Sequence, residues 1–218
     1  MCYNYKTSII SFSLGMVSAA IALICKRFEL GMLILFYSQM QFSEAIIWRA
    51  IDTNNVELNK KGTRYGKHLL ATHNIAIGLG IIMREIYRKR TLTAFTLLPL
   101  TVGIVFYGII TKVYRDTPHQ EVTYPLKKCE TRSCQHPGNR LQWPFPHSWY
   151  IYSFIISIIM LIVYIEPVNT KIYLTTIFSI LFALSYFVHP SSVGSVWCFS
   201  TAIMAPVIVG GDILLNAK

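Results

Sequence analysis

Four side chains in the segment 30–48 share one face of a helix and carry groups that can bind a ligand. Gln41, Glu44 and Trp48 are spaced by three and four residues, and Tyr37 lies one turn earlier. An amide, a carboxylate and polar aromatic rings can hydrogen-bond a small molecule, and a carboxylate is also an acceptable zinc ligand. Because a charged side chain is costly inside an apolar helix, Glu44 predicts either a functional site or a buried partner such as a neighbouring cation.

Other polar and titratable residues lie toward one end of the remaining apolar segments. If successive helices alternate in direction, these residues converge on the membrane face from which the N-terminus enters. We call that face side A and the opposite face side B. The sequence predicts a polar pocket open to side A, above a side B half that is almost purely apolar with basic flanks. The leading expected function is the binding or transport of a small molecule or lipid in this pocket. The expected ligand-binding residues are Gln41, Glu44, Trp48, His73, Asn74, His189 and Trp197.

A metal site is an alternative use of the same residues. Glu44, His73, His147 and His189 are suitable zinc ligands by type, but each would come from a different helix. His68 and His73 are five residues apart, so they do not share a helix face as the pair in an HxxxH motif does. We therefore expect no metal, no cofactor and no catalytic residue. A metal-dependent hydrolase within the membrane is only the third candidate function.

Seven apolar stretches must position these side chains. A helix rises about 1.5 Å per residue, so about 20 residues cross a hydrocarbon core of about 30 Å. We expect an all-α, seven-transmembrane-helix bundle that forms one domain over residues 1–218, with an extramembrane loop over 114–148. The expected helices span residues 7–25, 30–48, 67–83, 91–113, 149–165, 172–188 and 196–215.

The composition agrees with a membrane protein whose main partner is the lipid bilayer. Hydrophobic residues make up 53% of the chain, charged residues only 14%, and the mean hydropathy is +0.45. The net charge of +10 comes from Lys and Arg beside helix ends, as in Lys26-Arg27. Such residues attract anionic headgroups, and no basic soluble domain indicates nucleic-acid binding. The first apolar stretch runs on to this basic pair, which favours a retained helix over a signal peptide.

Orientation and the long loop leave several alternatives open. The Lys and Arg pattern gives a slight preference for side B as the cytoplasmic face. Cys129 and Cys134 form a C-x4-C pair that can be a disulfide, two free thiols or part of a metal clip, depending on the compartment. Trp residues near helix ends, among them Trp48 and Trp197, are typical of an interfacial aromatic belt. If the polar residues only tune packing, the protein is a structural or host-interaction membrane protein without a ligand.

Two short segments resemble a known group of proteins. They are the run from Gln39 to Trp48 (QMQFSEAIIW) and the run from Gly194 to Cys198 (GSVWC). With the expected helix count, they are similar to an uncharacterised family of seven-helix membrane proteins from large DNA viruses and protists. The resemblance implies the fold and a viral or protist membrane setting, and it implies no catalytic residue. Rhodopsin-like chemistry is not expected, because no lysine lies inside the last helix.

Overall fold

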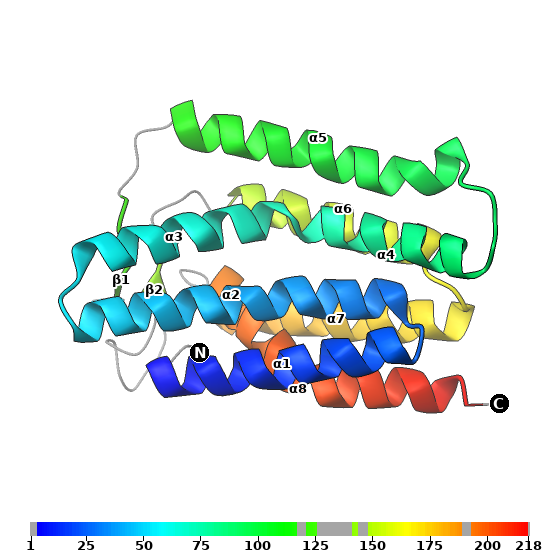
Figure 1. Cartoon of the computed structure of the whole chain (residues 1–218), viewed down its shortest axis with the longest axis horizontal. Coiled ribbons are helices and arrows are strands. Elements are labelled where there is room, and N and C mark those ends of the chain that lie inside the picture. Colours follow the sequence, from blue (N-terminus) through cyan, green and yellow to red (C-terminus); the bar gives the residue numbers. More distant parts are fainter. Residues whose placement is uncertain (1–3, 117–120, 126–140, 144–147, 189–192, 218) are drawn as a thin grey trace.

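A computed structural model describes residues 4–116, 121–125, 141–143, 148–188 and 193–217, and within them the chain folds as a bundle of long helices (Figure 1). The all-α prediction is confirmed except for one short antiparallel ribbon, in which Tyr124 pairs with Gln142 and Pro125 with Leu141. The elements are α1 Tyr5–Ile24, α2 Phe28–Asp52, α3 Val56–Ala71, α4 His73–Tyr87, α5 Ala94–Asp116, β1 Tyr124–Pro125, β2 Leu141–Gln142, α6 Ser148–Tyr164, α7 Val168–Val188 and α8 Val193–Leu215.

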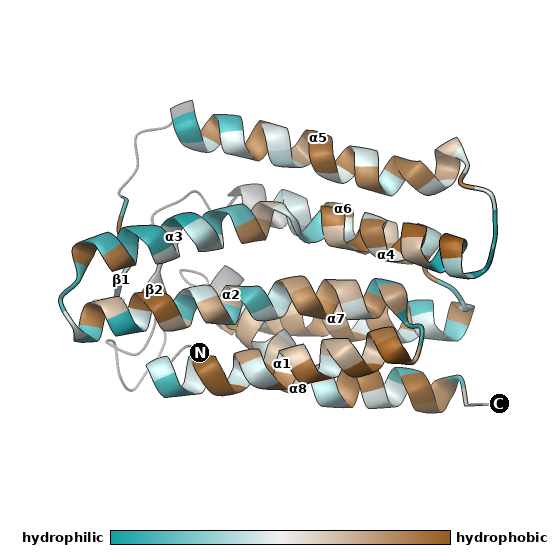
Figure 2. Ribbon diagram, viewed as in Figure 1, coloured by the Kyte–Doolittle hydropathy of each residue, from teal (hydrophilic) through white to brown (hydrophobic). Residues whose placement is uncertain are grey.

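Most of these helices are long and apolar enough to cross a membrane. Within the described residues, five qualify singly, namely α1, α2, α5, α7 and α8, and α3 with α4 qualifies as a sixth if the pair is one span. The described apolar part of α6, Ile155–Tyr164, is shorter. Hydrophobic residues follow the helices along the middle of the bundle, where the backbone satisfies its own hydrogen bonds (Figure 2). The chain is therefore a multi-pass integral membrane protein.

The prediction of one regular helix over residues 67–83 was wrong. The helix starts at Val56, where Asn55 caps it by accepting a hydrogen bond from the Leu58 N–H (3.0 Å). It then breaks at Thr72, and α4 leaves at 53° to α3. The Thr72 hydroxyl donates to the Leu69 carbonyl at 2.7 Å, and the Thr72 N–H donates to the same oxygen. This tight turn replaces the regular ladder at the break. Figure 1 shows the break near the middle of the bundle.

Helix α2 is the centre of the bundle and packs against α1, α3, α4 and α8. Its apolar side chains, including Leu33, Ile34 and Met40, are fully buried. Helices α6 and α7 close the bundle beside α4 and α8. In contrast, α5 contacts chiefly α4 and exposes large side chains such as Phe95 and Val105, as expected of a lipid-facing helix.

Glycines allow α4 to approach its neighbours backbone to backbone. A Cβ atom at Gly78 would lie 2.6 Å from the Leu100 backbone of α5, and one at Gly103 would lie 2.8 Å from the Ile75 nitrogen. A Cβ at Gly80 would collide with the backbone of Glu29 at the start of α2. Close approach of this kind is how helices associate where water provides no driving force.

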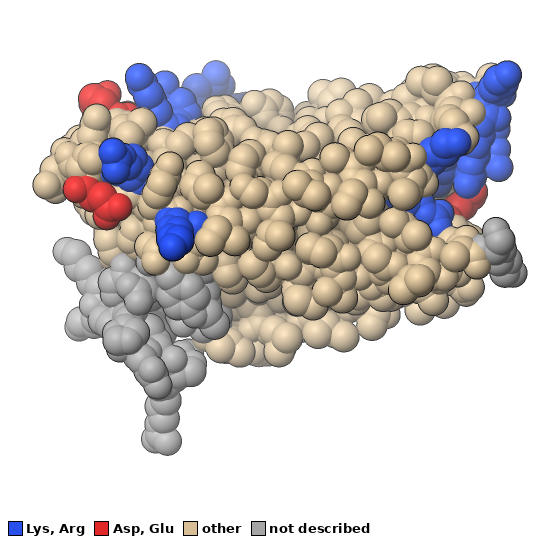
Figure 3. All heavy atoms as spheres, turned by 60° about the horizontal axis from the view of Figure 1, so that its bottom comes forward, with Lys and Arg blue, Asp and Glu red and all other residues tan. Residues whose placement is uncertain are grey.

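Charged residues gather at the two ends of the bundle and leave a broad uncharged band between them (Figure 3). The N-terminus and the C-terminus lie at opposite ends (Figure 1). The end that carries the N-terminus corresponds to side A. It includes the amphipathic helix α3, whose Lys60, Lys61 and Arg64 face outward or partly outward.

Candidate functional site

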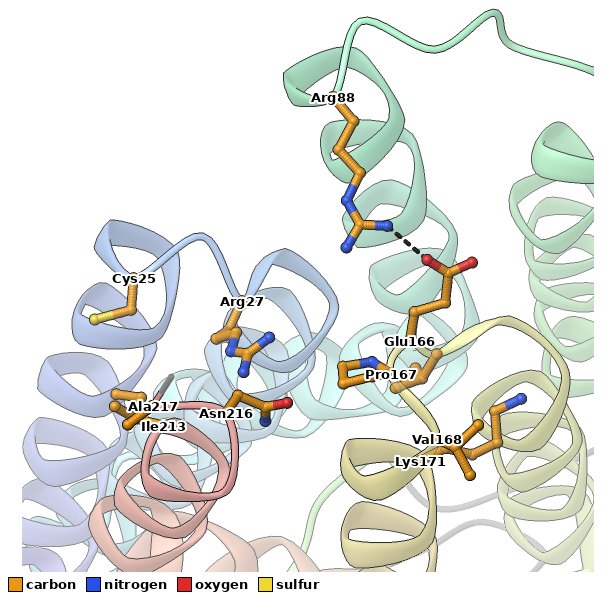
Figure 4. A pocket seen from close by; sticks show the side chains of 11 residues that line it. Cys25, Arg27, Arg88, Glu166, Pro167, Val168, Lys171, Ile213, Asn216 and Ala217 are labelled. Carbon is orange, nitrogen blue, oxygen red and sulfur yellow. Dashed lines mark hydrogen bonds and ion pairs between the residues drawn. The ribbon is translucent and has the colours of Figure 1, made fainter.

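An open pocket of about 690 Å³ lies at the side B end of the bundle, between two turns and two further helix ends (Figure 4). This volume is within the range of small-molecule sites. Its walls come from the α1–α2 turn, the end of α4, the α6–α7 turn and the end of α8. The residues that line it are Cys25, Arg27, Arg88, Ile165, Glu166, Pro167, Val168, Lys171, Ile213, Asn216 and Ala217.

Sharp helix ends bring two arginines to this pocket. Lys26 has φ of 64°, and the Arg27 N–H donates back to the Ala22 carbonyl at 2.8 Å. Lys89 has φ of 54°, and the Arg90 N–H donates back to the Glu85 backbone carbonyl at 2.9 Å. Both are Schellman-type ends with lysine at the left-handed position that glycine normally occupies. These turns hold Arg27 and Arg88 where the chain reverses direction.

The third wall is the start of α7. The Pro167 carbonyl accepts the first helical hydrogen bond, from the Lys171 N–H at 3.0 Å. The N–H groups that precede Lys171 in the first turn have no partner within the helix and carry the positive end of the helix dipole. Lys171 stands one turn along, and Figure 4 shows its ammonium on the α7 side, directed away from Arg27. This helix end therefore adds positive potential to the pocket.

The two arginines of the pocket are held in place by carboxylates. Arg88 Nη1 lies 2.5 Å from Glu166 Oε2, and Arg27 Nε lies 3.0 Å from Asp212 Oδ2. The hydrogen bond from Arg88 keeps the pKa of Glu166 below its ordinary value, against a smaller opposing effect of burial. Among the described residues Lys171 has no ion-pair partner. Arg90 Nη1 also lies 3.8 Å from Glu166 Oε2, so the cations around the pocket outnumber its two carboxylates and the local charge is positive.

Asp212 is the anchor beneath the pocket floor. It is fully buried, although the sequence places it inside an apolar helix. The Thr170 hydroxyl donates to Asp212 Oδ1 at 2.7 Å, and the Asn216 amide donates to Thr170 Oγ1 at 2.9 Å. Asp212 therefore joins α2, α7 and α8 through one carboxylate, and it fixes the guanidinium of Arg27.

The expectation of an almost purely apolar side B half was wrong. Arg84, 7% exposed, contacts Glu29 Oε1 at 2.5 Å and Glu85 Oε1 at 2.8 Å. It also donates to the Tyr164 carbonyl at the end of α6. The sequence suggests that Arg84 is an ordinary basic flank, but Glu29 at the start of α2 and Glu85 beside it in α4 draw it inward. Buried charges survive in such places when they are paired and hydrogen-bonded.

The side A residues of the predicted pocket point into the bundle, as expected. Gln41, Glu44 and Asn74 are fully buried, and His73 is 2% exposed. Gln41 Oε1 accepts a hydrogen bond from the Ser11 hydroxyl at 2.9 Å. These side chains lie at helix–helix contacts, and their role in binding a ligand stays a prediction.

Asn74 is held by hydroxyls of α6. Its amide donates to Ser153 Oγ at 3.3 Å, and its carbonyl accepts from the Ser157 hydroxyl at 2.7 Å. Such bonds between helices replace the water that the membrane interior lacks. They link the start of α4 to α6 just beyond the helix break.

His73 lies in an aromatic group at the centre of the bundle. Its ring centroid is 4.3 Å from that of Tyr37 and 6.1 Å from that of Trp197. Its Nε2 atom has no hydrogen-bond partner within the part of the chain described. Trp48 and Trp197 are 6% and 4% exposed, so the interpretation of these two as part of an interfacial aromatic belt was wrong.

Several predicted residues fall outside the described part of the chain. They are His147, His189, Cys129 and Cys134. Among the residues that are described, no group of three or more His, Cys, Asp or Glu side chains gathers as a metal site would require.

Sequence reasoning missed the side B pocket, although one signal was present. Asp212 is an ionisable residue inside the last apolar stretch, and such a residue calls for a partner. Its partner Arg27 was interpreted as a basic residue that only flanks a membrane helix.

Comparison with known protein families, curated proteins and solved structures finds no match to this chain.

Proposed function

We propose that this protein is a membrane-embedded binding protein that holds an anionic ligand in the side B pocket. The observation that supports the proposal best is that Arg27, Arg88 and Lys171, from separate connections, all line about 690 Å³ of open space, with the Lys171 ammonium on the α7 side (Figure 4). The ligand class remains that expected from the sequence, a small molecule or lipid. The proposed site moves from side A to side B.

The arginines of the pocket have donors to spare. A guanidinium carries five N–H donors, and Asp212 and Glu166 each engage one nitrogen of their arginine. The carboxylates therefore orient the two groups without using all their hydrogen-bonding capacity. Helix N-termini and planar guanidinium groups both suit phosphate or carboxylate oxygens. A pre-oriented cluster of this kind binds anions with little loss of side-chain freedom.

The number of membrane crossings can be proposed in more detail than the five or six candidate spans give. We propose that α3 and α4 form one bent span and that α6 forms another, which makes seven spans with the termini on opposite sides. Its support is that α6 packs between α4 and α7, where it must be at membrane depth. The relation to the seven-helix group of large DNA viruses and protists is likewise a proposal, and it assigns no activity.

Anion binding can be measured on the purified protein in an uncharged detergent. We expect sn-glycerol 3-phosphate to raise the melting temperature relative to chloride at equal ionic strength. Arg88→Gln and Lys171→Gln should each weaken this binding about tenfold, because a hydrogen bond to a charged group contributes about 1.5–3 kcal/mol. Lys112→Gln, on exposed α5, is the matched control and should bind as the native protein does.

An equal response of native and pocket variants to glycerol 3-phosphate would contradict anion binding in this pocket. That result would favour the second candidate, a structural membrane protein without a ligand. A specific observation supports this candidate: Gln41 and Asn74 make hydrogen bonds to serines of neighbouring helices, as packing residues do.

A further inference from the structure

We infer that the anion is the phosphodiester headgroup of a lipid from the side B leaflet, held on Arg27, Arg88 and Lys171 with its acyl chains along α1, α7 and α8. This inference rests on the proposed function and names its ligand. Phosphate groups occur in soluble metabolites as well as in lipids, so the chemistry of the cations alone does not distinguish them. The apolar surroundings of the pocket distinguish a lipid from a soluble phosphate.

Apolar side chains border the pocket where it meets the lipid-facing surface. Val168 lines the pocket and is 63% exposed. Ile24 and Leu214, next to the pocket residues Cys25 and Ile213, are 77% and 76% exposed. A site for a soluble anion needs no such border. A lipid needs both parts, since its head must meet charge while its chains stay in apolar contact.

The depth of the pocket suits a headgroup. It lies at the ends of helices that span the apolar band, in the zone where charged residues gather (Figures 3 and 4). Arg27 and Arg88 are partly exposed, at 21% and 34% of their side chains. Basic residues at this depth meet lipid phosphates directly, and their aliphatic stems can lie along acyl chains.

The charge balance of the pocket favours an anionic headgroup. Three lining cations stand against Glu166 and buried Asp212, and Arg90 Nη1 lies 3.8 Å from Glu166 Oε2 beyond the lining residues, so the positive charges are in excess. A phosphodiester carries one negative charge and suits this excess. Phosphatidylglycerol has this charge, whereas phosphatidylcholine adds a quaternary ammonium that the cluster would repel.

The test compares two lipids with a soluble phosphate ester. Binding of phosphatidylglycerol, phosphatidylcholine and sn-glycerol 3-phosphate is measured by native mass spectrometry on protein released from an uncharged detergent. We expect phosphatidylglycerol to bind at least about tenfold more tightly than either of the others, because its chains add apolar contact. Leu214→Asn, on the apolar border and outside the pocket lining, should reduce this preference several-fold and leave glycerol 3-phosphate binding unchanged. Leu92→Asn, at the side B end beyond α4, is the matched control and should change neither.

The outcomes separate the inference from the proposed function. If glycerol 3-phosphate binds in a manner that depends on Arg88 while phosphatidylglycerol has no advantage, the lipid inference fails and anion binding stands. If phosphatidylcholine binds as tightly as phosphatidylglycerol, the phosphodiester assignment is overturned. If none of the three binds above the level of the Arg88→Gln variant, both the inference and the proposed function fail.

Discussion

At the scale of single residues, Arg84 offers the sharpest test of the buried charges. It neutralises Glu29 and Glu85 and satisfies the Tyr164 carbonyl. Arg84→Gln would leave two carboxylates buried with too little compensation. We expect a loss of about 3–5 kcal/mol in the free energy of unfolding. Unfolding of the purified protein in mixed micelles measures this loss.

The control for Arg84 is an exposed basic residue. Lys61→Gln, on the outer face of α3, should change the free energy of unfolding by less than about 0.5 kcal/mol. Equal stability of the Arg84 and Lys61 variants would show that the side B ion network is not buried as described.

Glu166 lowers the net positive charge of the pocket, and this charge therefore depends on pH. Its folded-state pKa lies below the ordinary value of 4.5, chiefly because Arg88 donates to it. The Arg88–Glu166 attraction is therefore complete above pH 4.5 and is lost as the pH falls through the lowered pKa. Since Glu166 is half exposed, its effect on stability is below about 1 kcal/mol.

The charge of Glu166 should have a larger effect on anion affinity than on the free energy of unfolding. Glu166→Gln is expected to bind sn-glycerol 3-phosphate several-fold more tightly than the native protein at pH 7, because one opposing charge is gone. The ratio of the two affinities should approach one only when the pH falls below the lowered pKa of Glu166, where native Glu166 itself becomes neutral. A ratio that is independent of pH would contradict this role, and calorimetric titration at several pH values measures it.

At the scale of elements, the contact between α4 and α5 depends on glycine. Gly78→Ala places a Cβ 2.6 Å from the Leu100 backbone, which cannot yield as a flexible side chain would. We expect a loss of about 1–3 kcal/mol in the free energy of unfolding. The matched control is Gly108→Ala in α5, at a position where the added Cβ meets nothing within 4 Å. It should stabilise the helix by about 0.5–1 kcal/mol. Destabilisation of equal size in both variants would contradict the close packing.

The sequence predicted the helices well where hydrophobicity alone decides them. The runs that became α1, α2, α5, α6, α7 and α8 are each bounded within a few residues of their predicted ends. The α3–α4 break carries no such signal, since Thr72 is compatible with a helix and bends it only through its bond to Leu69. The polar first half of α3 was missed for a related reason, because Lys and Arg dilute its hydrophobicity.

The candidate site was predicted less completely than the helices. The inward stripe of Gln41, Glu44 and Trp48 followed from helical periodicity, which local sequence contains. The pairing of Arg27 with Asp212 joins residues from opposite ends of the chain, and the packing of α1 and α2 against α8 brings them together. The side B pocket depends on such distant contacts, so spacing along the chain did not reveal it.

At the scale of the whole molecule, the account requires an odd number of crossings. Tags placed at the two termini should be accessible from opposite sides of sealed vesicles. If side B is cytoplasmic, as the basic residues slightly favour, the C-terminal tag is the cytoplasmic one. Two tags on the same side would contradict the seven-span arrangement and would require either α6 or the α3–α4 pair to leave the membrane.

Charge at both ends of the molecule creates a competing location for anionic lipid. Side B has the pocket cations Arg27, Arg88 and Lys171, whereas side A has the outer face of α3 with Lys60, Lys61 and Arg64. Helix α3 presents its cations on an open surface, and Lys60 is already paired with Glu57 and Glu121. The pocket surrounds a headgroup on several sides, so it should be the preferred location.

Photo-crosslinking in a bilayer tests this central claim most directly. A phosphatidylglycerol analogue with a photoreactive group on its glycerol head is incorporated with the protein into nanodiscs, and labelled peptides are mapped by mass spectrometry. The account predicts labelling at the α1–α2 turn and the α6–α7 turn, lost in Arg88→Gln and reduced by unlabelled phosphatidylglycerol. Labelling confined to α3, or spread evenly over both ends and unchanged by Arg88→Gln, would contradict it.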